Sequence, residues 1–69
     1  MRLIEVRVSA NQPVATVEAR TNGGAWMTLA NTGADTWSKA TPTKRGSTVE
    51  FRATSASGEH VVSQAFTWR

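Results

Sequence analysis

The fold of this chain is decided by residues 14–29, which read VATVEARTNGGAWMTL. Apolar and polar residues alternate on both sides of Asn22-Gly23-Gly24, which is the pattern of two strands joined by a tight turn. Asn and Gly tolerate the positive φ angles that such a turn requires. The stretch therefore predicts a β-hairpin, and the length of its loop sets the pairing register.

Two loop lengths give different partners for Ala19. A two-residue Asn22-Gly23 turn would place Ala19 opposite Trp26, whereas a three-residue loop with Gly24 in a left-handed bulge would place it opposite Met27. We favour the second loop because it alone keeps the apolar residues of both strands on one face.

The favoured register also pairs Val17 with Leu29 and Arg20 with Trp26. Trp26 is then predicted to stand outside the core, beside Arg20. The simplest interpretation is that Arg20 stacks on the indole and stabilises the hairpin through a cation–π contact.

The same alternation recurs along the rest of the chain and indicates further short strands near residues 3–10, 36–40, 47–54 and 59–67. No window has a sustained helical period. The sequence therefore predicts an all-β fold, a small Ig-like β-sandwich of about six to seven short, mostly antiparallel strands. The predicted inward residues are Ile4, Val6, Val8, Ala15, Val17, Ala19, Ala25, Met27, Leu29, Val49, Phe51, Ala53, Val62 and Phe66.

The last predicted strand fits the alternation of apolar and polar residues less well than the others. A tight Ser55–Gly58 turn would place Val62 opposite Phe51, but Val61 and Gln64 fit the alternation poorly, which suggests an irregularity there. Trp68 shares the phase of Phe66 and is expected to close one end of the core.

Length and composition indicate one small domain, residues 1–69, with a marginal core. The chain has no cysteine and one histidine, so neither a disulfide nor a structural metal site is expected, and no cofactor is implied. No apolar run is long enough to cross a membrane. The net charge of +3 comes from eight Lys and Arg against five Asp and Glu, spread along the chain, and is typical of a solvated surface.

Catalysis is not expected from this set of residues. His60 lies beside a turn without an evident acidic partner, and the carboxylates are dispersed. Glu18 and Glu50 could share an outer face, yet ordinary cross-strand pairing with Arg20 and Arg52 is the better interpretation. We therefore expect that the protein is not an enzyme.

Three tryptophans and no tyrosine in so short a chain point instead to binding. A rigid indole offers an apolar platform that matches the C–H face of a sugar, and nearby polar groups can hydrogen-bond its hydroxyls. Trp37 could lie in the core or on the surface. The predicted ligand-binding residues are Trp26, Trp37, Arg20, Asn22, Glu18 and Thr28.

A wider sequence pattern consists of residues 14–20, the hairpin Asn22-Gly23-Gly24-Ala25-Trp26, Trp37, and residues 49–55 running into Gly58 and Val61-Val62-Ser63. This pattern resembles the C-terminal carbohydrate-binding domain of expansins and related Ig-like modules of secreted bacterial cell-wall proteins. The resemblance covers about three quarters of the chain. The chain is shorter than expansin domains and lacks their aromatic-rich segment before Val14, so the binding role transfers to Trp26 and Trp37 alone.

The resemblance implies a non-catalytic module, tethered to a larger secreted protein, that binds a cell-wall polysaccharide such as cellulose, β-1,3-glucan or chitin. The alternative is a structural or protein-interaction Ig-like module. Nucleic-acid binding is not expected, because no strand interleaves basic and aromatic residues densely enough for a stacking platform.

Overall fold

A computed structural model describes residues 2–9, 13–41, 43–62 and 66–67 of the chain. Every regular element in these ranges is a β-strand, which confirms the predicted all-β class. The strands are β1 (Arg2–Arg7), β2 (Val14–Thr21), β3 (Met27–Thr28), β4 (Ala30–Asn31), β5 (Thr36–Thr41), β6 (Thr48–Ser55), β7 (His60–Val62) and β8 (Phe66–Thr67).

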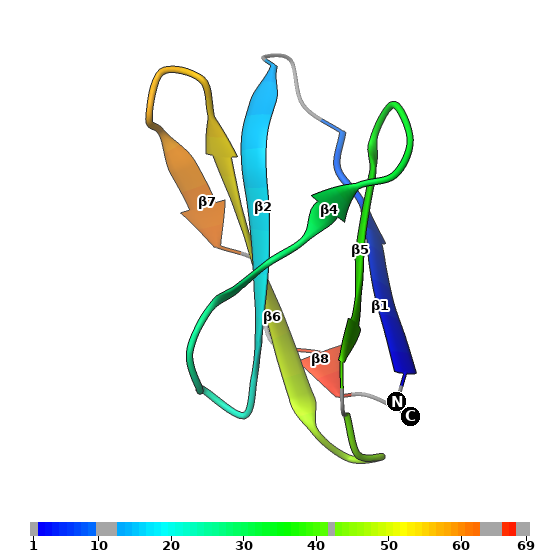
Figure 1. The fold of residues 1–69 in the computed structure, drawn as a ribbon. Coiled ribbons are helices and arrows are strands. Elements are labelled where there is room, and N and C mark those ends of the chain that lie inside the picture. Colours follow the sequence, from blue (N-terminus) through cyan, green and yellow to red (C-terminus); the bar gives the residue numbers. More distant parts are fainter. Residues whose placement is uncertain (1, 10–12, 42, 63–65, 68–69) are drawn as a thin grey trace.

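The strands form two antiparallel sheets that face one another as a sandwich (Figure 1). One sheet has the order β1-β5-β4, and the other has the order β3-β2-β6-β7, with β8 also paired to β6. Because β2 occupies one edge of β6, strands β7 and β8 must pair with consecutive parts of its other edge.

The chain passes from one sheet to the other at Leu29. Strand β3 pairs with β2 in the larger sheet, whereas β4, which begins at the next residue, pairs with β5 in the smaller sheet. The Leu29 amide still donates to the Val17 carbonyl at 2.9 Å, as the predicted register requires. Its side chain is 3% exposed, so this crossing residue also fills the core.

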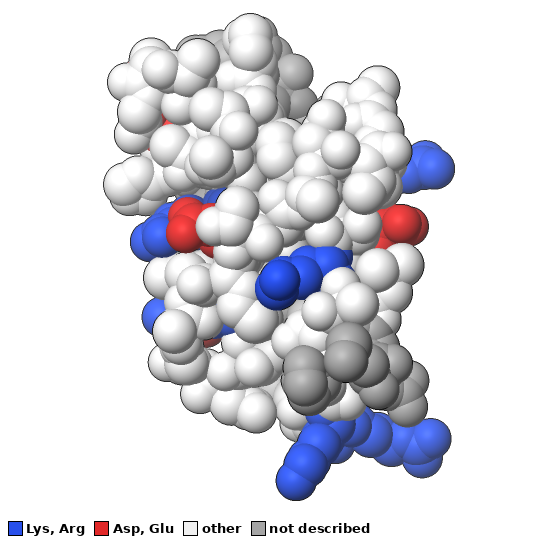
Figure 2. All heavy atoms as spheres, viewed as in Figure 1, with Lys and Arg blue, Asp and Glu red and all other residues white. Residues whose placement is uncertain are grey.

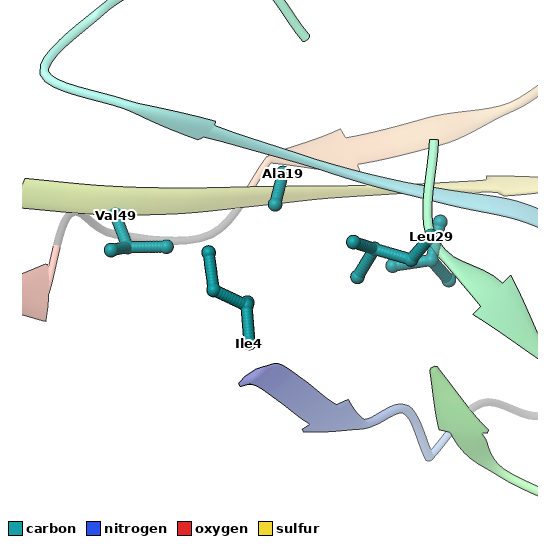
Figure 3. Packing of buried hydrophobic residues seen from close by; sticks show 5 residues of the cluster. Ile4, Ala19, Leu29 and Val49 are labelled. Atoms are coloured by element: carbon teal, nitrogen blue, oxygen red, sulfur yellow. The ribbon is translucent and has the colours of Figure 1, made fainter. Parts of the chain in front are cut away.

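The core lies between the two sheets. Its buried members are Ile4, Val17, Ala19, Leu29 and Val49. Ile4 extends from β1 toward the opposite sheet, where Ala19 and Val49 face it (Figure 3). Val6, Val8, Trp37, Phe51 and Ala53 pack around this cluster and are half-buried.

Three of the predicted inward positions are wrong, and two of them lie in the β2–β3 hairpin. Ala15 is exposed because the β2–β6 register shifts between Val14 and Thr16, and Val14 packs against the core in its place. Ala25 is exposed as well, since it lies in the loop before β3 rather than in the strand.

The last strand differs from its prediction in register. Val62 lies opposite Arg52, not Phe51, and it is 47% exposed. The suspected irregularity is confirmed, because β8 pairs with β6 in a register shifted by one residue relative to β7. Gln64 and Trp68 lie outside the described residues.

Candidate functional site

The β2–β3 hairpin turns at Asn22-Gly23, which have φ angles of 52° and 69°. The Gly24 amide donates to the Thr21 carbonyl at 2.9 Å, which closes a four-residue turn. Positive φ at both central residues defines a type I′ turn, whose twist matches that of paired strands. The expectation that Gly24 carries the left-handed conformation is wrong, since Asn22 and Gly23 carry it.

The predicted register is nevertheless confirmed, with Ala19 opposite Met27. A two-residue turn alone would have placed Ala19 opposite Trp26. The additional residue is accommodated between Gly24 and Trp26, where the chain leaves the regular strand before β3. The loop therefore has the turn of the shorter alternative and the register of the longer one.

Trp26 lies on the outer side of the larger sheet against two arginines. The guanidinium carbons of Arg20 and Arg52 each lie 4.5 Å from the centroid of its ring. The predicted contact with Arg20 is thus present, and Arg52 from β6 adds a second one. Trp26 is half-buried as a result.

Both arginines are also paired with carboxylates across the β2–β6 interface. The Arg20 Nε and Nη2 donate to the two carboxylate oxygens of Glu50 at 3.0 and 3.2 Å. Arg52 approaches one oxygen of Glu18, with Nε at 2.9 Å and Nη2 at 2.8 Å. The predicted cross-strand pairing of these four charges is confirmed, and Trp26 covers a network in which positive and negative charges balance.

Two other predicted ligand-binding residues sit at the hairpin. Thr28 is exposed on β3 opposite Glu18, so it joins the Trp26 face. The Asn22 side chain is engaged instead with the start of β6: its Oδ1 accepts from the Thr48 amide at 3.1 Å, and its Nδ2 donates to Ser47 Oγ at 3.4 Å.

Trp37 belongs to a different part of the molecule. It lies on β5 in the smaller sheet, opposite Val6 on one side and Asn31 on the other. The two indoles are therefore in different sheets and do not form one flat platform. Trp37 is half-buried against the core, an arrangement between the two predicted alternatives.

Trp37 also lines a surface hollow of about 690 Å³. Its walls come from the end of β1, the start of β2 and the β4–β5 connection, and consist of Val8, Ser9, Pro13, Val14, Ala15, Asn31, Ala34, Asp35 and Trp37. Asn31 and Asp35 are exposed there. The hollow thus combines one aromatic ring with apolar and polar side chains, and more of its lining surface is polar than apolar.

Sequence reasoning missed Asn31 and Asp35 as site residues. Asn31 ends β4 and Asp35 lies in the connection before β5, and neither belongs to a sequence motif. Both contact Thr36: Asn31 Nδ2 donates to its carbonyl at 3.1 Å, and Asp35 Oδ1 accepts from its hydroxyl at 3.3 Å. Their approach to Pro13 and Ala15 depends on how the two sheets pack, and no local pattern reports that.

Charge does not single out either region. Figure 2 shows Lys and Arg side chains at several separate places on the visible face, with uncharged surface between them. Within the described ranges, no group of three or more His, Asp or Glu side chains could hold a metal ion. No helix long and apolar enough to span a membrane occurs among these residues either.

Comparisons with models of protein families, with curated proteins and with solved structures gave no match for this chain. The likeness to expansin carbohydrate-binding domains therefore depends on the hairpin, tryptophan and strand residues quoted above. The geometry of the two tryptophan sites is therefore the basis on which function is inferred.

Proposed function

We propose that the protein is a non-catalytic carbohydrate-binding module and that Trp37, rather than Trp26, is its stacking platform. The observation that carries this proposal is the hollow of about 690 Å³, which brings Trp37 together with Asn31 and Asp35. A pyranose ring presents an apolar face to an indole and hydroxyl groups to neighbouring amide and carboxylate groups.

The Trp26 face is less suited to this role. Arg20 and Arg52 already lie over its ring, and their charges are met by Glu50 and Glu18. A sugar that stacked in their place would have to break these contacts. We assign Trp26 to the stability of the hairpin, together with Arg20, Glu18 and Asn22.

The ligand class is a neutral cell-wall polysaccharide, with cellulose, β-1,3-glucan and chitin as the polymers to test. A module of this kind would act as part of a larger secreted protein and bring its neighbouring domains to the polymer. Retention by the polymer, without bond cleavage, would be its contribution.

The test is co-sedimentation with each insoluble polymer, comparing the parent with variants at both sites. We expect Asn31→Ala and Asp35→Ala to weaken retention, and Trp37→Ala to weaken it by about tenfold or more, the size of a typical anchor contact. Trp26→Ala is the matched control and should be retained like the parent. Because Trp37 packs against the core, the two exposed positions keep the test valid if Trp37→Ala does not fold.

Loss of retention in Trp26→Ala with no change in Asn31→Ala and Asp35→Ala would move the site to the hairpin face and contradict the assignment. Absence of retention by all three polymers would overturn carbohydrate binding and favour a structural or protein-interaction module.

A further inference from the structure

Strand β1 forms one edge of the smaller sheet, and the two-residue strand β4 forms the other. The order β1-β5-β4 places β1 outermost, and within the described residues β5 is the strand that pairs with it. Its residues, Arg2–Arg7, contain neither proline nor glycine. An edge strand of this length offers a row of backbone groups to any second strand, unless something blocks it.

The hydrogen bond between the Val8 amide and the Asp35 carbonyl shows which groups are free. In an antiparallel pair, backbone groups of successive residues point to opposite edges. Since the backbone groups of Val8 point toward the β4–β5 connection, the backbone groups of Val6 and Ile4 point toward β5 in the same way. The amide and carbonyl groups of Leu3, Glu5 and Arg7 therefore point to the unpaired edge.

The same three residues carry the exposed side chains on the outward face of β1. Glu5 and Arg7 are exposed, and Leu3 is 56% exposed. The ion pairs given by the described residues are Arg20–Glu50 and Arg52–Glu18, so neither Glu5 nor Arg7 is paired with another described charge. The edge thus carries one acid and one base, two residues apart, both available to a partner.

We propose that β1 pairs antiparallel with β1 of a second copy of this chain, about a two-fold axis at Val6. Glu5 of each copy then lies opposite Arg7 of the other, which gives two symmetric ion pairs, and Val6 lies opposite its own equivalent. Leu3 lies opposite Ser9. A surface that is its own complement is what a two-fold interface requires.

Charge selects this register among the neighbouring ones. Only residues whose backbone groups point to this edge, Leu3, Glu5 and Arg7, can hydrogen-bond to the same residues of the second copy. The two-fold axis must therefore pass through a residue and can shift only by one residue at a time. An axis at Glu5 would place two glutamates face to face, and an axis at Arg7 would do the same with two arginines. Directly opposed like charges destabilise strand pairing, whereas opposed unlike charges stabilise it.

The test is sedimentation velocity of the parent chain at concentrations from micromolar to millimolar, in low salt and without saccharide. We expect a concentration-dependent monomer–dimer equilibrium. Arg7→Glu and Glu5→Arg should each weaken dimerisation by at least about tenfold, because both cross-strand pairs become repulsive. The double variant Glu5→Arg/Arg7→Glu restores opposite charges in the same register and should dimerise like the parent.

Glu59→Arg is the matched control, since Glu59 is an exposed acid beside β7, an edge strand of the larger sheet. Far-ultraviolet circular dichroism of each variant checks that the sandwich is intact. A parent chain that stays monomeric to millimolar concentration would overturn the proposal. Dimerisation that survives both single charge reversals, or that is lost in Glu59→Arg, would overturn it as well.

Discussion

Arg52 lies over the indole of Trp26, with its guanidinium carbon 4.5 Å from the centroid of the ring. Arg52 belongs to β6, whereas Trp26 precedes β3, and β2 separates these strands in the sheet. The contact therefore links the hairpin to the centre of the larger sheet across an intervening strand. It gives Trp26 a structural role that does not need a ligand.

Replacing Trp26 tests this role. We expect Trp26→Ala to lower the free energy of unfolding by about 1–2 kcal/mol, since each of two partly exposed cation–π contacts contributes about 0.5–1 kcal/mol. Urea denaturation monitored by circular dichroism measures the change. Trp26→Phe keeps an aromatic ring and should lose less. Equal stability of the parent and Trp26→Ala would show that the two arginines do not anchor the hairpin.

The two ion pairs should respond differently to lysine. Arg20 engages both oxygens of Glu50, whereas Arg52 engages one oxygen of Glu18. A lysine keeps the charge but loses the planar fork. We therefore expect Arg20→Lys to cost more than Arg52→Lys, with both losses below about 1 kcal/mol because the side chains are partly exposed. Denaturation at low and high salt measures them, and an equal or reversed order would contradict the geometric argument.

The type I′ turn requires a residue at position 23 that tolerates a positive φ angle. Gly23 has a φ of +69°, so Gly23→Ala should destabilise the fold by about 1 kcal/mol, the cost of a left-handed conformation for an L-residue with Cβ. Gly23→Asn should lose less, because asparagine adopts this conformation more readily. Thermal unfolding compares the two variants. A larger loss for asparagine than for alanine would argue against the type I′ turn.

Ile4 should be sensitive to the loss of a single methyl group. It is fully buried and extends from the smaller sheet into the core, so Ile4→Val should cost about 1 kcal/mol. Val61, which is 74% exposed, is the matched apolar control, and Val61→Ala should change the free energy of unfolding by less than about 0.5 kcal/mol. Similar losses at both positions would contradict the placement of the core.

Alternation and turn residues were sufficient to predict the all-β class and the hairpin register. These features depend on contacts between neighbouring strands, which leave a period of two in the sequence. The same reasoning failed at Ala15, because the register shift between Val14 and Thr16 changes the phase within an otherwise regular strand. It failed again at Val62, where the length of the β6–β7 turn sets the partner.

The sites were less predictable than the strands. The Arg20–Trp26 contact follows from hairpin register, but the contact from Arg52 requires that β6 lie beside β2. The hollow at Trp37 requires the packing of one sheet on the other. Asn31 and Asp35 join it from the end of β4 and from the β4–β5 connection, neither of which carries a recognisable motif. Side chains gathered by tertiary packing leave no fixed spacing in the sequence.

The most direct test of the proposed function is an NMR titration of ¹⁵N-labelled protein with soluble fragments of the three polymers: cello-, laminari- and chito-oligosaccharides. With at least one of them, we predict progressive shifts of the Trp37 indole N–H and of the Asn31 and Asp35 amides, while the Trp26 indole N–H stays in place. Shifts confined to Trp26 and its hairpin, or no shift with any of the three, would contradict saccharide binding at Trp37.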